Sequence, residues 1–151
     1  MVQDTQILGF NFTKISVEKN QEYKGQTELK SNIDVSSIEK ADIDLVKDCL
    51  KIAFKFELDY GELGKILMHG FMILLLNPKI TKETLSQWQN KEKISEDVNR
   101  TILNIILRKC TLKAIQFEDE IGLPFHIQLP RVQFGSNSNQ PNKPEDSNNL
   151  K

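Results

Sequence analysis

Residues 50–76, LKIAFKFELDYGELGKILMHGFMILLL, decide the fold of this 151-residue chain. In the first half of this stretch the apolar side chains occupy every second position, which is the period of a β-strand and not of a helix. Gly61 and Gly64 follow, and glycines supply the positive φ angles that hairpin loops often need. Residues 65–76 are apolar on both faces after His69, which predicts a strand covered on both sides. The stretch therefore predicts an antiparallel strand pair.

Two further strands are expected before this pair. In residues 7–18 the apolar positions change parity near Thr13, which predicts either a bulge or a strand buried on different sides along its length. Residues 19–26 are polar and form a loop, and residues 27–35 alternate as a half-exposed strand does. Adjacent strands joined in this way predict a four-stranded antiparallel meander.

A long helix is expected after the sheet. Ser95 is a good N-cap, Glu96 and Asp97 suit the positive end of the helix dipole, and Gly122 with Pro124 ends the helix. One apolar stripe consists of Val98, Ile102, Ile106, Cys110, Ala114, Phe117 and Ile121. Other apolar residues widen this stripe, so the helix must be covered from more than one side. Because the chain has no second long helix, a partner subunit is the natural cover, and we expect a homo-oligomer (dimer or tetramer).

The remaining segments are polar or rich in proline. Residues 79–93 are expected to form a polar, partly helical connection that contains the only tryptophan, Trp88. Residues 122–134 contain two prolines and should run extended against the body, and residues 135–151 have the composition of a disordered polar tail. We therefore expect one α+β domain over residues 1–134.

Charge and cysteine content exclude several classes of protein. The net charge is -1 and the isoelectric point about 6.1, whereas proteins that bind nucleic acid usually carry a basic excess. Two distant cysteines, Cys49 and Cys110, are too few for a disulfide framework and are expected to be buried and reduced. There is no signal-peptide pattern at the N-terminus, and the longest apolar run, residues 66–76, is too short to span a bilayer. We expect a cytoplasmic protein that neither inserts into membranes nor binds nucleic acid.

Residue patterns for catalysis are not found. The two histidines, His69 and His126, have no Cys or carboxylate at metal-ligand spacing, and each is interpreted as a core or interface histidine. The sequence has no P-loop, GxGxxG or GxSxG motif. Glu118-Asp119-Glu120 is interpreted as a solvated helix face, with an acidic patch for a basic partner as the functional alternative. We predict no enzyme activity, catalytic residue, metal or cofactor.

The main functional signal is the number of apolar side chains, in residues 65–76 and in the long helix, for which the rest of the chain offers no obvious packing partner. Such surface usually marks an oligomer interface or a binding groove, and a groove for extended apolar peptide is the more specific hypothesis. The client-binding residues predicted on this basis are Phe10, Phe12, Met68, Phe71, Met72 and Trp88.

The order of elements resembles that of the bacterial export chaperone family SecB, over about residues 7–134. The resemblance is carried by Phe10-Asn11-Phe12 through Val17-Glu18, Thr27 to Val35, Cys49 to Tyr60 with its glycine turn, Lys65 to Leu76, the helix from Ser95, and Leu129-Pro130-Arg131-Val132-Gln133-Phe134. It implies a holdase that works without ATP, binds unfolded clients along apolar grooves, and assembles as a tetramer of paired dimers through the first strand and the long helix. A link to protein export would follow from it.

The chain departs from that family after the long helix. The family's Arg-Gly-Thr-Phe-Pro turn is reduced here to Gly122-Leu123-Pro124-Phe125, and a polar tail stands where a short second helix is expected. These departures favour a divergent member with other clients. The alternatives are a dedicated interaction or scaffold module that serves one partner and, with less support, a small-ligand-binding protein or an enzyme whose site forms between subunits.

Overall fold

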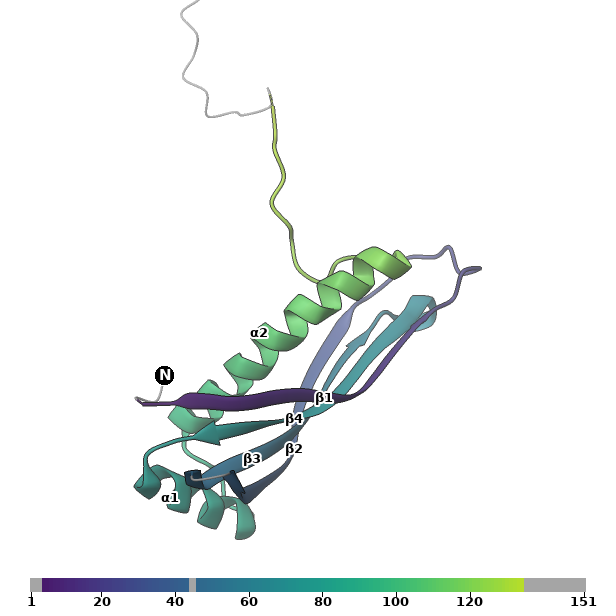
Figure 1. The fold of residues 1–151 in the computed structure, drawn as a ribbon. Helices are drawn as coiled ribbons and strands as arrows, with labels where there is room; N and C mark the ends of the chain where they lie inside the picture. Colours follow the sequence, from purple (N-terminus) through teal and green to yellow (C-terminus); the bar gives the residue numbers. More distant parts are fainter. Residues whose placement is uncertain (1–3, 44–45, 135–151) are drawn as a thin grey trace, which may run out of the picture.

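Four long strands and two helices make up the part of the chain that the computed structural model describes, residues 4–43 and 46–134 (Figure 1). The elements are β1 (Gln6–Lys19), β2 (Lys30–Ile43), β3 (Val46–Asp59), β4 (Gly64–Leu75), α1 (Pro78–Gln89) and α2 (Glu96–Ile121), with a 3₁₀ turn at Gly61–Leu63 between β3 and β4. The α+β class, the four-stranded antiparallel sheet and the long helix agree with the sequence prediction. The predicted tail, residues 135–151, lies outside the described residues.

The order of the strands corrects the predicted meander. The sheet has the order β1-β4-β3-β2, and every neighbouring pair is antiparallel. Strands β2, β3 and β4 follow one another as expected, but β1 lies beside β4 and not beside β2, which is a Greek-key arrangement. In this order both backbone edges of β4 are paired, and the loop of residues 20–29 is long enough to carry the chain from β1 across to β2.

Both edge strands contain residues that have no partner in the register. In β1, Ile7 pairs with Leu74 and Gly9 with Ile73, so Leu8 is extra, and Thr13 is extra in the same way. Of the two alternatives predicted near Thr13, the bulge is therefore the one that the strand contains. A further irregularity leaves Ser36 of β2 unpaired. This bulge reverses the parity of the strand, which explains why the sequence pattern placed its end at residue 35 although β2 continues to Ile43.

The core lies between the sheet and the helices. The even-numbered side chains of β3 and β4 point to it, and the largest of them, such as Phe54, Phe56, Met68 and Met72, are at most 1% exposed. The core cluster contains none of the odd-numbered residues of β4. On that opposite face Ile73 is buried and Leu67, His69, Phe71 and Leu75 are half-buried.

The long helix α2 begins and ends where its capping residues predict. The Ser95 hydroxyl accepts a hydrogen bond from the backbone N–H of Val98, and Gly122 ends the helix in the left-handed conformation with φ 84°. The buried stripe recurs every four residues: Val98, Ile102, Ile106, Cys110, Ala114 and Glu118. The sequence prediction ended this stripe at Phe117 and Ile121: Phe117 is half-buried against the core cluster, but Ile121 is exposed, and Glu118 is buried in addition.

Helix α1 forms the first part of the connection over residues 79–93, which was predicted to be partly helical. The side chain of Asn77 accepts a hydrogen bond from the N–H of Lys79, and Pro78 occupies the first turn, where a missing N–H costs nothing. Side chains of α1, including Leu85 and Trp88, pack against the core cluster. The helix therefore closes the core at the end of the sheet near the β2–β3 connection (Figure 1).

Residues 123–134, called the arm below, follow α2. Leu123 is buried against the core, whereas most of the later residues are exposed. Figure 1 shows the arm turning back along the end of α2 and then leaving the body. The prediction of an extended segment is correct, but it docks on the body only at its beginning.

Candidate functional site

Phe10 and Phe12, two of the predicted client-binding residues, belong to an aromatic cluster at the β1 side of the sheet. Their ring centroids lie 5.4 Å apart, and those of Phe10 and Phe54 lie 5.0 Å apart. The ammonium group of Lys109 on α2 lies 5.9 Å from the Phe10 ring. Both phenylalanines are half-buried, so part of each ring is available at the surface while the rest supports the core.

Met68 and Met72 correct the sequence prediction, which took them for exposed apolar side chains. Both are 0% exposed in the core between the sheet and α2. They occupy even positions of β4, and the even positions face the helix. Neither can contact a client while the sheet and the helix remain packed.

Phe71 and Trp88 lie in two other places. Phe71 is on the opposite face of the sheet, where the ammonium group of Lys51 lies 4.7 Å from its ring centroid. Trp88 is half-buried on α1. The six predicted residues therefore do not form one surface: Phe71 lies on the opposite face of the sheet from the other five, and of those five Met68 and Met72 are fully buried.

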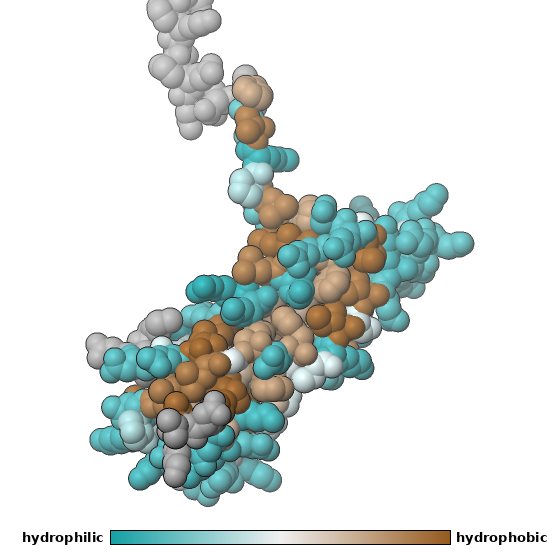
Figure 2. Space-filling view, viewed as in Figure 1, coloured by the Kyte–Doolittle hydropathy of each residue, from teal (hydrophilic) through white to brown (hydrophobic). Residues whose placement is uncertain are grey.

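The exposed apolar surface lies mostly elsewhere, on β1, α2 and the arm. The large apolar residues at least 37% exposed are Ile7, Leu8, Ile15, Leu107, Leu112, Ile121, Phe125, Ile127, Leu129, Val132 and Phe134. Figure 2 shows hydrophobic patches along the body, broken by hydrophilic residues, and further hydrophobic residues on the arm. The sequence carried a signal for this surface in the wide apolar stripe of α2 and in the alternation of Phe125, Ile127 and Leu129.

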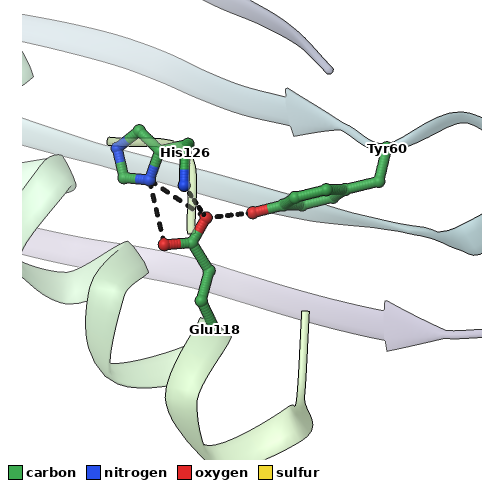
Figure 3. A network of polar contacts seen from close by, with 3 residues as sticks. All are labelled: Tyr60, Glu118 and His126. Carbon is green, nitrogen blue, oxygen red and sulfur yellow. Dashed lines mark hydrogen bonds and ion pairs between the residues drawn. The ribbon is translucent and has the colours of Figure 1, made fainter. Parts of the chain in front are cut away.

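A buried polar cluster lies where α2, β3 and the arm meet (Figure 3). Glu118 of α2 is 0% exposed, and its Oε2 accepts hydrogen bonds from the Tyr60 hydroxyl and, at 2.9 Å, from the backbone N–H of His126. The His126 Nδ1 lies 3.0 Å from both carboxylate oxygens. A single carboxylate thus joins three segments that are distant in the sequence.

The aromatic members of this cluster are as buried as the carboxylate. Tyr60 is 1% exposed, and the His126 side chain is 7% exposed with its ring edge-on to Phe56. Burial, together with the hydrogen bond to the Glu118 carboxylate, raises the pKa of Tyr60 far above its ordinary value of 10.0. The phenol therefore stays protonated and donates to Glu118 at neutral pH.

The cluster corrects the interpretation of the acidic run at the end of α2. Asp119 and Glu120 are exposed, as a solvated helix face requires, but Glu118 is not part of that face. His126 fits its predicted role as a core histidine on its Nδ1 side, while its Nε2 is buried without a hydrogen-bond partner among the described residues. The four-residue repeat from Val98 through Ala114 was the signal that could have identified Glu118.

Thiol and metal chemistry have little support in the described part of the chain. Cys49 and Cys110 are buried and free, as predicted, and burial raises the pKa of Cys110 to about 12. Within residues 4–43 and 46–134, no group of three or more His, Cys, Asp or Glu side chains is placed to hold a metal ion. Nor does this part of the chain contain a helix with the length and apolar character needed to cross a membrane.

Comparison with known proteins adds no relative from which a function could be transferred. No protein-family model, no curated protein and no solved structure matches the chain.

Proposed function

We propose that this protein is a SecB-like holdase that binds unfolded or extended polypeptides without ATP and works as a homo-oligomer. The observation that carries this proposal is the apolar surface of β1, α2 and the arm, where single side chains reach 86% exposure. Apolar surface of this extent on a small protein is typical of a site that contacts other proteins.

The open edges of the sheet support the same function. Strands β1 and β2 are both edge strands of 14 residues, and within the described residues each pairs with one neighbour. An extended client can add to such an edge through backbone hydrogen bonds, while apolar surface nearby binds its side chains. Backbone pairing does not depend on sequence, so this mode suits clients of many kinds.

Aggregation assays test the proposal directly. The purified protein, without ATP, is added at near-stoichiometric ratio to two unrelated chemically denatured proteins, and light scattering follows their aggregation. We expect suppression of both. Suppression of neither by a stably folded protein would contradict the holdase proposal, and suppression of one alone would favour the module dedicated to one partner.

Substitutions in the arm show which surface carries the activity. The variant Ile127→Ser/Leu129→Ser/Val132→Ser/Phe134→Ser removes exposed apolar side chains that lie outside the core. Its matched control, Gln128→Ser/Gln133→Ser, changes exposed polar residues of the same segment. We expect weaker suppression from the first variant and unchanged suppression from the control, with both variants as stable as the wild type.

A further inference from the structure

The face of the sheet opposite the helices, called the outer face below, combines an apolar central column with charged flanks. The column lies on β4 and consists of Leu67, Phe71, Ile73 and Leu75, none of which belongs to the core cluster. Ile73 is buried among its neighbours in the sheet, whereas the other three are half-buried. Helices α1 and α2 both pack on the other side of the sheet, so they leave this column uncovered.

The charges of the outer face are arranged in rows that run across the sheet from β1 to β2. Residues that pair in the register lie side by side and point to the same face. One such row consists of Glu18, Lys65, Asp59 and Lys30. Another row consists of Lys14, His69, Lys55 and Asp34. Each row therefore begins and ends with opposite charges.

These end charges have little to neutralise them within the chain. Among the described residues, Lys14, Glu18 and Lys30 are exposed and form no ion pair. Asp34 is also exposed and accepts a hydrogen bond from the uncharged side chain of Asn32 at 3.2 Å. Strands β1 and β2 are three strand spacings apart, which is about 14 Å, so the two ends of a row cannot pair with each other.

From this pattern we propose that the outer face packs against the outer face of a second copy of the chain, about a twofold axis that runs along the strands between β3 and β4. This rotation leaves each row over the same row of the second copy and exchanges its two ends. The residues that then face each other are Lys14 and Asp34, Glu18 and Lys30, and Lys65 and Asp59. Each of these pairs occurs twice, because the interface is symmetric.

The apolar column fits the same arrangement. Phe71 shares a row with Ala53 of β3, so its large ring faces the small Ala53 side chain of the second copy. The aliphatic parts of Lys51 and Lys55 can cover the rest of the column while their ammonium groups reach water. Stacked sheets of this kind lie about 10 Å apart.

The size of the outer face is close to that of a specific interface. The four strands lie about 4.8 Å apart, and residues 50–59 of β3 advance by about 3.3 Å each, which gives roughly 600 Å² in projection. A standard interface takes about 800 Å² of accessible surface from each partner. The face can therefore support a dimer, with the paired charges fixing its register.

A twofold axis across the strands is the other way to stack two aligned sheets, and it fits less well. It places each strand over its own copy and reverses the order of the rows. With the axis in the middle of the paired region, Lys14 faces Asn11 and Glu18 faces Gln6, so neither charge gains a partner. With the axis along the strands, no two carboxylates and no two ammonium groups face each other.

Charge reversal tests this interface without any client, so its result does not depend on the proposed holdase activity. All variants are made in Leu107→Lys/Leu112→Lys, which disrupts exposed apolar surface on α2, and light scattering after gel filtration gives the mass. We expect this parent protein to have the mass of two chains. Lys14→Glu and Asp34→Lys should each raise the dissociation constant of the dimer about tenfold or more, because like charges then face each other.

Mixing the two single variants provides a complementation test. In a dimer that contains one copy of each variant, opposite charges face each other again, as they do in the combined variant Lys14→Glu/Asp34→Lys. We expect the equimolar mixture and the combined variant to regain the mass of two chains. Lys24→Glu makes the same charge change at an exposed position of the loop between β1 and β2, and it should not lower the mass.

Three results would overturn the proposal: a parent protein with the mass of one chain, a single reversal that leaves the dimer intact, or a mixture that does not recover. Urea unfolding confirms that each variant is folded, which we expect because the substituted side chains are exposed. Glu18→Lys and Lys30→Glu repeat the same test at the other row and replace the first pair if one of its variants does not fold.

Discussion

Gly70 lies in the middle of β4, where a glycine has no side chain to pack and would ordinarily weaken the strand. A Cβ at this position would overlap the carbonyl oxygen of Asn11 on β1 and lie 2.7 Å from Cζ of Phe54. The missing side chain therefore lets the Phe54 ring lie across β4, where it meets Phe10 and Phe12.

We expect Gly70→Ala to lower the free energy of unfolding by about 1–3 kcal/mol, because the added methyl group overpacks this contact. Gly9→Ala is the matched control in β1, since a Cβ there would have Cγ1 of Ile73 as its nearest neighbour at 3.9 Å, an ordinary contact. Urea unfolding followed by circular dichroism measures both variants. Equal losses in the two variants would show that close packing at Gly70 is not the cause.

Tyr60 makes the free energy of unfolding fall as the pH rises above about 10. Its pKa is 10.0 in an unfolded chain and is raised in the folded one, so above pH 10 the folded state holds a proton that the unfolded state has released. Stability then falls as pH rises, by at most about 1.4 kcal/mol per pH unit for one group. We expect the urea midpoint to fall less steeply above pH 10 in Tyr60→Phe than in the wild type. The thiol of Cys110 contributes equally to both proteins, so identical slopes would contradict this role of Tyr60.

Among the elements, both edge strands contain bulges, and a further shift in register lies where the end of β2 pairs with the start of β3. The extra residues Leu8 and Thr13 lie in β1 and Ser36 lies in β2, whereas β3 and β4 pair without interruption from Leu50 to Asp59. Bulges interrupt the row of backbone groups that an edge offers to another strand. The edges therefore accept short extended segments more readily than long ones, which limits self-association through the sheet.

Helix α2 depends on its N-terminal cap. The Ser95 hydroxyl lies 3.3 Å from the backbone nitrogen of Val98 and is the side-chain cap of this helix end. We expect Ser95→Ala to destabilise the protein by about 1 kcal/mol and Ser95→Asp to retain most of the stability, since aspartate also accepts from the helix N-terminus. Thermal or urea unfolding measures the stability of both variants. If Ser95→Asp lost as much stability as Ser95→Ala, the loss would not be due to the cap.

For the whole molecule, apolar surface on α2 predicts self-assembly. Leu107 is 44% exposed and Leu112 is 60% exposed, although both lie on a helix that packs against the sheet. A monomer would leave this surface in water, whereas a second subunit would cover it.

We expect light scattering after gel filtration to give a mass that is a multiple of the 17.4 kDa chain. The variant Leu107→Lys/Leu112→Lys should lower that mass, while Asn104→Lys/Gln116→Lys, which adds the same charges at exposed polar positions of the same helix, should not. A wild-type mass of one chain would contradict assembly and leave the α2 surface to clients.

Local patterns predicted the elements well and the candidate site poorly. The alternation in β3 and the caps Ser95 and Gly122 depend on neighbouring residues only, so they can be recognised in the sequence. Exposure does not follow from such patterns: Met72 is covered because β4 is a central strand under α2, and Glu118 is covered because the arm folds back over it.

The sequence by itself determined the class of fold and the long helix with its ends, because each follows from side-chain period or backbone conformation over a few residues. Near Thr13 it left two alternatives, and the register of β1 with β4 decided for the bulge. Only the tertiary structure decided that β1 pairs with β4, and that Tyr60, Glu118 and His126 meet. These contacts join residues far apart in the chain, and their stability comes from burial that no local segment can provide alone.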